Sequence, residues 1–162
     1  MTEVVFGVVP VLAAVLAGLF AGLFLAFSMA VMPGLARAGD RTMVEAMRGM
    51  NTAILNPLFA LVFVGAPVAA LGSTALFFAA GASASTVWSG AALVLMVATV
   101  VVTFAVNVPR NNALERAGAP ARIQDPAAVR AAFEPVWVRW NHLRSLASVA
   151  ALVCAVVALV TG

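Results

Sequence analysis

Residues 4–32 read VVFGVVPVLAAVLAGLFAGLFLAFSMAVM, and every residue in this stretch is apolar, small or proline except Ser28. An α-helix rises 1.5 Å per residue, so a helix of this length exceeds the roughly 30 Å hydrocarbon core of a bilayer. Pro33 and Gly34 follow directly, and both are typical of helix ends. We therefore predict that residues 4–32 form a membrane-spanning helix that ends at this Pro-Gly pair.

The composition of the whole chain fits the same environment. Of its 162 residues, 64% are hydrophobic and only 9% are charged, whereas soluble domains have roughly half apolar and a quarter charged residues. Three further apolar runs predict spans at about residues 53–80, 87–108 and 141–161. Because each crossing needs about 20 apolar residues, the chain length suits four spans in one domain. We predict an all-α, four-transmembrane-helix bundle over residues 1–162, with the lipid bilayer around it.

The two polar connections, residues 33–52 and 109–140, predict the orientation of the bundle. All nine basic residues are arginines: three fall in the first connection, none in the turn between the second and third spans, and six between Asn107 and Arg144. Short cytoplasmic loops carry the excess of Lys and Arg. We therefore expect both amphipathic connections to be cytoplasmic and both termini to lie outside.

Several functional classes lack the residues that they need. A net charge of +3 alone would permit nucleic-acid binding, but the arginines flank apolar runs instead of forming a water-exposed patch. Cys154 and His142 are the only cysteine and histidine, which are too few for a typical zinc site. The chain has no Gly-rich phosphate loop, and no ionisable residue falls well inside a span, as pumps and ion channels need. We expect no nucleic-acid partner, no metal and no other cofactor.

A ridge of small residues follows one face of the first predicted span. Its members, four residues apart, are Ala14, Gly18, Gly22, Ala26 and Ala30. Such ridges let helix backbones approach closely in lipid. We expect the ridge to pack within the bundle, and a homo-oligomer through the Gly18/Gly22 face is the alternative.

Two polar clusters stand at the inner ends of the third and fourth predicted spans. The first holds Asn107 and Asn111, and the second holds Trp137, Trp140, Asn141, His142 and Arg144. On a helix the two asparagines of the first cluster lie one turn apart. In the second cluster Trp137, Asn141 and Arg144 share a face, so amide, indole and guanidinium groups can converge. Anchoring at the membrane interface also favours Trp and Arg at helix ends, and Asn commonly caps helices, so a purely structural role is the alternative, above all for the tryptophans.

Four motifs, in order along nearly the whole chain, resemble the anthrone oxygenase-like family of integral membrane proteins. They are AFSMAVMPGL from Ala26 to Leu35, Asn51-x4-Asn56-Pro57, Asn107-Val-Pro-x-Asn111-x2-Leu114 and Trp137-x2-Trp140-Asn141-x2-Arg144. The resemblance implies a four-helix membrane bundle in the inner membrane of a bacterium. It also implies an oxygenase that converts a hydrophobic, anthrone-type aromatic substrate to a quinone with O2 and without metal or flavin.

Roles for individual residues follow from this resemblance as a hypothesis. His142 is the candidate general base, because an imidazole exchanges protons near neutral pH. Arg144, Asn107 and Asn111 are the candidate donors to the enolate oxygen, and Trp137, Trp140, Asn141 and Asn56 are the candidate substrate-binding residues. Some family members have a histidine three residues before the motif arginine. This chain has Asn141 there and His142 one position later, which turns the imidazole by about 100° on a helix.

Two non-enzymatic functions compete with the oxygenase. A small membrane subunit would use the small-residue ridge for assembly and the arginines for a partner or for anionic lipid. A small-molecule carrier would use Pro67 and Pro109 as flexing points, although the chain has no polar site at the middle of a span and no evident inverted repeat.

If the chain is an enzyme, we expect its substrate to enter from lipid between the third and fourth spans.

Overall fold

The computed structural model describes residues 2–162, and the chain has no strand within that range. Along the chain the elements are α1 (Thr2–Ala26), η1 (Phe27–Val31), α2 (Met32–Leu35), α3 (Asp40–Ala53), α4 (Pro57–Ala79), α5 (Ser83–Val102), η2 (Thr103–Asn107), α6 (Val108–Arg116), η3 (Pro120–Arg122) and α7 (Pro126–Val160). The segments η1 and η2 are π-helical turns, and η3 is a short 3-10 helix.

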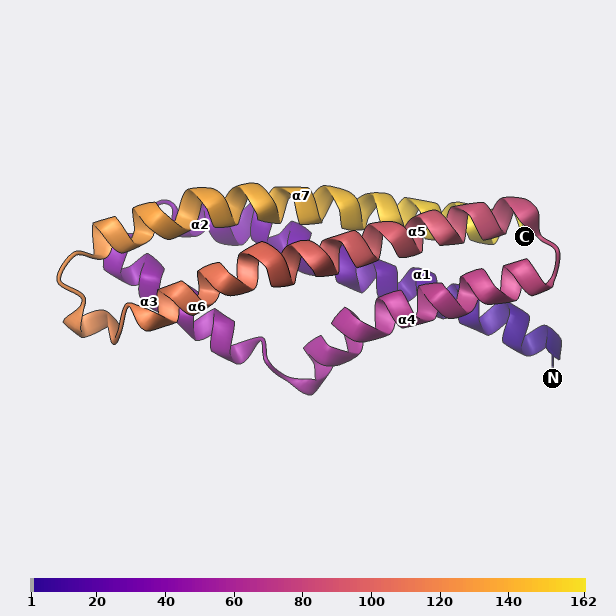
Figure 1. Ribbon diagram of the computed structural model, residues 1–162, viewed down its shortest axis with the longest axis horizontal. Coiled ribbons are helices and arrows are strands. Elements are labelled where there is room, and N and C mark those ends of the chain that lie inside the picture. Colours follow the sequence, from indigo (N-terminus) through magenta and orange to yellow (C-terminus); the bar gives the residue numbers. More distant parts are fainter. Residues whose placement is uncertain (1) are drawn as a thin grey trace.

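Helices α1, α4, α5 and α7 form an elongated bundle in which α1 and α5 each pack against both α4 and α7. Both termini and the α4–α5 turn lie at one end of the molecule, while α3, α6 and the start of α7 lie at the other (Figure 1). We call this second end the polar end. Four helices of the described chain are long and apolar enough to cross a membrane, which confirms the predicted all-α, four-span architecture.

Two prolines that were expected near helix ends lie inside continuous helices. The first helix runs through Pro33 and Gly34 to Leu35, and the third runs through Pro109 to Arg116. Each proline lies two positions after the last residue of a π turn. A backbone hydrogen bond to the carbonyl oxygen five residues earlier closes each turn: Met32 N donates to Phe27 O, and Val108 N donates to Thr103 O. A proline ring crowds the carbonyl four residues earlier, and a π turn absorbs that crowding by adding one residue to the turn.

Both predicted connections are mostly helical. The first contains α3, and α7 begins at Pro126, well before the predicted start near residue 141. Asp125 caps α7, since its Oδ1 accepts a hydrogen bond of 2.9 Å from Ala128 N, and proline at the first helical position is favourable. With 35 residues, α7 is about 52 Å long, so it exceeds a bilayer core of about 30 Å.

A belt of exposed apolar side chains marks the part of the bundle that faces lipid. On its polar side the belt ends at Met29, Leu55, Phe104 and Leu143, on four different segments of the chain. Along α7 the belt runs from Leu143 to Val160, a rise of about 26 Å, which is close to the thickness of the hydrocarbon core. The α3 and α6 helices and the first part of α7 therefore extend beyond the belt.

The buried core has two parts. Within the belt, Phe20, Phe63 and Met96 pack with small residues of all four long helices. At the polar end, Met43 and Met47 of α3 pack with a second set of residues from α2, α6 and α7. Ion pairs of 2.8 Å between Arg48 and Glu115 and of 3.0 Å between Arg130 and Asp40 also join α3 to α6 and α7.

The small-residue ridge of α1 is only partly used within the bundle. A Cβ atom placed on Gly18 would lie 3.8 Å from Leu152 Cδ1, whereas one on Gly22 would meet no described atom within 4 Å. The side of α1 that is most deeply buried holds Ala17, Phe20 and Phe24 instead. Association of two copies through Gly22 therefore stays a prediction.

Removal of the central aromatic side chain of the core should destabilise the bundle. We expect Phe20→Ala to lower the free energy of unfolding in detergent by about 3 kcal/mol, because Phe20 is fully buried and its removal leaves a cavity. Phe78→Ala is the matched control, since Phe78 is 75% exposed on the lipid-facing belt. Equal effects of the two substitutions on thermal unfolding would contradict this packing.

Candidate functional site

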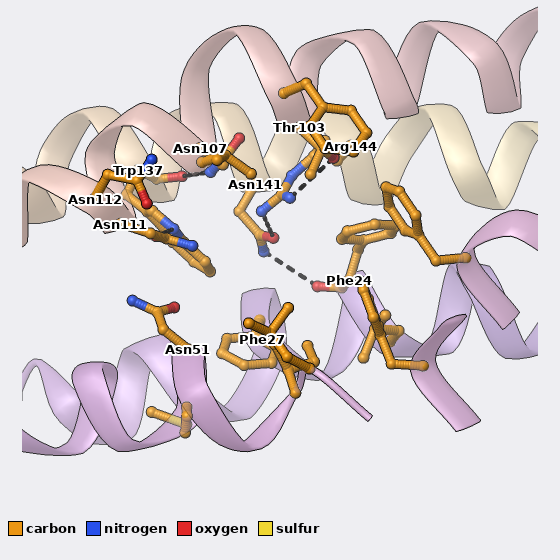
Figure 2. Close-up of a pocket in the computed structure, with 18 of the residues that line it drawn as sticks. Phe24, Phe27, Asn51, Thr103, Asn107, Asn111, Asn112, Trp137, Asn141 and Arg144 are labelled. Atoms are coloured by element: carbon orange, nitrogen blue, oxygen red, sulfur yellow. Dashed lines mark hydrogen bonds between the residues drawn. The ribbon is translucent and has the colours of Figure 1, made fainter. Parts of the chain in front are cut away.

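A cavity of about 390 Å³ lies in the polar end, at the level where the apolar belt stops. Its wall is built by α1, α3, α4 and α7 and by the η2–α6 segment that continues α5 (Figure 2). The lining residues are Leu23, Phe24, Phe27, Met50, Asn51, Thr52, Ile54, Leu55, Phe59, Phe63, Thr103, Phe104, Asn107, Val108, Asn111, Asn112, Glu115, Trp137, Asn141 and Arg144. The cavity thus combines an aromatic wall with a cluster of amides and one guanidinium group.

Arg144 is the central charged group of this cavity and is only 5% exposed. Its Nη2 donates to Asn141 Oδ1 at 2.8 Å, and its Nη1 donates to Thr103 Oγ1 at 3.2 Å. The guanidinium carbon lies 4.6 Å from the centre of the Phe24 ring and 5.4 Å from that of Trp137. Two oxygen acceptors and two aromatic faces therefore hold the cation, and all of these groups are neutral.

No carboxylate among the described residues neutralises Arg144. The ion pairs found in the described part of the chain join Arg48 to Glu115 and Arg130 to Asp40 and Glu134. The Nε atom of Arg144 is buried and has no hydrogen-bond partner among the described residues. A buried charge without a counter-ion is unfavourable by several kcal/mol, so the cavity is suited to a ligand that carries negative charge.

Two asparagine side chains also have unpaired polar atoms in the cavity wall. Asn107 Nδ2 donates to the carbonyl oxygen of Trp137 at 3.3 Å. The opposite amide orientation would bring two carbonyl oxygens together, so Oδ1 must point away, and it has no partner in the described chain. Asn51 Nδ2 is likewise buried without a partner there. Together with Arg144 Nε, these atoms are two donors and one acceptor that are buried without a partner among the described residues.

Trp137 forms part of the cavity wall and is buried, in contrast to a tryptophan that anchors a helix at the membrane surface. Its Nε1 donates to Asn111 Oδ1 at 2.9 Å. Its ring centre lies 5.6 Å from that of Phe27 and 6.0 Å from that of Phe133. These contacts fix the indole plane beside Arg144, so Trp137 and Asn111 orient each other.

The structure brings together five of the eight residues that the sequence singled out. Arg144, Asn107, Asn111, Trp137 and Asn141 all line the cavity (Figure 2). The other three lie elsewhere. Asn56 is exposed and caps α4, since its Oδ1 accepts a 3.0 Å bond from Phe59 N. Trp140 lines a separate shallow hollow with Arg110 and Pro109, and His142 is exposed beside Ser28.

Several lining residues were not singled out by the sequence. Thr103 lies in an apolar run, and no pattern there separates it from a threonine that merely bonds its own helix, as its Oγ1 also does by donating to Thr99 O at 2.8 Å. Asn51 belongs to one of the four motifs, although no role was assigned to it. The aromatic wall of Phe24, Phe27 and Phe59 could not be distinguished from ordinary apolar positions in the spans.

The opening of the cavity lies between the α3–α4 connection and the η2–α6 region. Its most exposed apolar lining residues are Leu55, at 77%, and Phe104, at 59%, and both stand at the edge of the belt. Glu115 and Asn112 line the same cavity from the exposed side of α6. Helices α5 and α7, between which access was expected, pack directly against each other. The opening therefore meets lipid on one side and the polar surface on the other.

Metal binding has little support in this cavity. In the part of the chain that the structure describes, no three His, Cys, Asp or Glu side chains come together. Among the lining residues Glu115 is the only carboxylate, and it is paired with Arg48.

Comparison with known proteins adds a family to this geometry. Residues 58–154 match the family described as anthrone oxygenase. The matched region runs from α4 into the second half of α7 and contains every cavity residue of η2, α6 and α7. No curated protein and no solved structure was found to match the chain.

The unneutralised charge of Arg144 predicts an unusual result for stability. We expect Arg144→Met to change the free energy of unfolding by no more than about 1 kcal/mol, because the lost hydrogen bonds are offset by relief from burying a charge. Arg139→Met, at an exposed position of α7, is the control. Thermal unfolding in detergent measures both variants. A loss of about 3 kcal/mol or more in Arg144→Met would show that the arginine serves the fold.

Proposed function

The chain belongs to the anthrone oxygenase family, and from this membership we propose that it oxidises a flat, hydrophobic anthrone-type substrate to a quinone with O2. The reaction uses no metal and no flavin. The oxidised centre is a ring methylene group flanked by aromatic rings and conjugated with a ketone. Removal of one methylene proton gives an electron-rich enolate, which is the species that reacts with O2.

The observation that carries this proposal is the buried Arg144 cation, which has no carboxylate partner among the described residues. A positive charge within a few ångströms favours the deprotonated form of a bound acid. Its Nε–H has no partner among the described residues, and we assign it as the donor to the enolate oxygen, where the negative charge develops. Asn107 Oδ1 and Asn51 Nδ2 provide the further acceptor and donor that would orient the substrate's other oxygens.

The size and lining of the cavity suit such a substrate. A volume of about 390 Å³ falls in the usual range of roughly 300–1,000 Å³ for small-molecule sites. Phe59 and Phe63 are stacked with ring centres 5.0 Å apart, and they line the cavity together with Phe24 and Phe27. Flat fused rings pack well against such faces, while most of the polar lining groups come from η2, α6 and α7.

The chemical steps balance without a further reagent. Water at the opening accepts the first methylene proton, since His142 lies outside the cavity. The enolate transfers one electron to O2, which gives a substrate radical and superoxide. These two radicals combine to form a carbon–oxygen bond. Protonation gives a hydroperoxide at the former methylene carbon. Loss of the second hydrogen from that carbon and cleavage of the O–O bond release water, so one substrate and one O2 give one quinone and one water.

The position of the opening supports access from the bilayer. Leu55 and Phe104 stand at the edge of the apolar belt, so a hydrophobic substrate dissolved in lipid reaches the cavity between α4 and η2. Glu115 lines the cavity from the exposed side of α6, where protons and water can exchange. All nine arginines fall in residues 37–48 and 110–144, the segments at or next to the polar end, so we further propose that the polar end faces the cytoplasm and that both termini lie outside.

The central test measures oxygen uptake and quinone formation by the purified protein with anthrone. We expect Arg144→Met to lower kcat/KM by at least about 100-fold, as loss of a donor to a developing oxyanion does. Arg139→Met should retain wild-type turnover. Wild-type protein that consumes anthrone no faster than empty detergent micelles would refute the oxygenase proposal.

The lateral opening has its own test in a matched pair of variants. We expect Leu55→Trp to lower kcat/KM by about tenfold, mainly through KM, because a larger side chain narrows the opening; such a change corresponds to about 1.4 kcal/mol. Leu58→Trp is the control, since Leu58 is 69% exposed nearby but does not line the cavity. Equal effects in steady-state kinetics would mean that the substrate takes another route.

A further inference from the structure

The hydroxyl group of Ser28, on η1, connects the outside of the bundle with the cavity. Its Oγ lies 2.8 Å from Asn141 Nδ2, 2.8 Å from Ser145 Oγ and 3.0 Å from His142 Nδ1. His142 is exposed, whereas Asn141 and Ser145 are buried. One hydroxyl group thus contacts three side chains of α7 at once.

The donors and acceptors in this cluster can be assigned. The Asn141 amide nitrogen donates both to Ser28 Oγ and to the carbonyl oxygen of Phe24, at 3.1 Å. Ser145 Oγ donates to the backbone carbonyl oxygen of Asn141 at 3.0 Å. Ser28 has a single hydroxyl proton, which is therefore free to go to Ser145 Oγ or to His142 Nδ1. If it goes to Ser145, then His142 donates to Ser28 from Nδ1.

This arrangement determines which end of the Asn141 amide faces Arg144. Because Nδ2 has two acceptors on the first helix, Oδ1 must point toward the guanidinium, where it accepts from Nη2 at 2.8 Å. A reversed amide would place two NH2-type donors against each other. The orientation of Arg144, and hence the direction of its unpaired Nε–H, follows from the orientation of Asn141.

We propose that Ser28 and His142 are positioning residues, which act through Asn141 to hold Arg144 in the orientation that the cavity needs. The effect of these residues on turnover rests on the proposed function of the cavity, whereas their effect on the orientation of Arg144 does not. His142 holds Ser28 from outside the bundle and exchanges no proton with the substrate. Because Asn141 and His142 are offset by one residue, the amide faces the cavity and the imidazole faces η1.

The test uses variants that remove or preserve single contacts. Ser28→Ala removes the hydroxyl group, and Ser28→Thr retains it. His142→Leu removes the contact to Ser28, whereas His142→Asn retains an amide near the position of Nδ1. Ser89→Ala is the control, because Ser89 is a buried serine whose hydroxyl donates within its own helix, to Ser85 O at 2.7 Å.

Two readouts separate this inference from the proposed function. The first is the ¹⁵N NMR signal of the Arg144 Nε–H group in ligand-free protein, identified by its loss in Arg144→Met. We expect this signal to shift or broaden in Ser28→Ala and His142→Leu, and to stay as in wild type in Ser28→Thr, His142→Asn and Ser89→Ala. It requires no substrate, so it stands even if anthrone is not oxidised.

The second readout is steady-state oxidation of anthrone. We expect Ser28→Ala and His142→Leu to lower kcat by about tenfold with a smaller change in KM, as loss of a bond that orders a charged donor does. Ser28→Thr and His142→Asn should recover most of that loss. An Arg144 signal that is unchanged in Ser28→Ala and His142→Leu would overturn the proposal. It would also be overturned if His142→Asn were as inactive as His142→Leu, because that result would indicate that the imidazole is the base.

Discussion

The side chains around the cavity are arranged so that they can bury the charged guanidinium group of Arg144. A bare charge at this depth is costly, yet the groups around it are a threonine hydroxyl, an asparagine oxygen and two aromatic faces, none of which is charged. Such partners disperse the positive charge without cancelling it, so its field stays available to a ligand. A carboxylate would stabilise the arginine better and would remove that field. Three acidic residues of the polar end, Asp40, Glu115 and Glu134, pair with Arg48 or Arg130 instead.

The two π turns determine which side chains meet this charge. Each turn contains about one residue more than an α-helical turn, so the face presented by every later residue is displaced by about 100° relative to a regular helix. Thr103 and Asn107 are the first and last residues of η2, and both are buried and bonded to α7. Ser28 lies in η1 and accepts a hydrogen bond from Asn141. The prolines that follow the turns help to maintain them, because a regular α-helical turn would force each ring against a carbonyl oxygen.

The sequence was sufficient for the four spans and for the convergence of Asn107, Asn111, Trp137, Asn141 and Arg144, because apolar run length and helical spacing are local properties. It was insufficient where the outcome depends on another helix. His142 and Asn141 are adjacent, and only the packing of α7 against α1 decides which of them faces inward. Pro33 and Pro109 look like helix ends in isolation, since the π turns that accommodate them have no sequence signature of their own. Asn51 reaches the cavity only because α3 folds back over it.

The polar extension of the bundle is therefore part of the site and more than a connection between spans. The third span continues past the apolar belt as α6, the first part of α7 lies beside it, and α3 packs on both through Met43 and Met47. The last residues of α3, Met50, Asn51 and Thr52, form one side of the cavity and limit its contact with water, where a high dielectric would weaken the attraction between a cation and an anion. With α3 in place the cavity has lipid at one edge of its opening and the polar surface at the other. The proposed substrate is apolar whereas its enolate is charged, and a site at this boundary offers an apolar surface to the first and polar groups to the second.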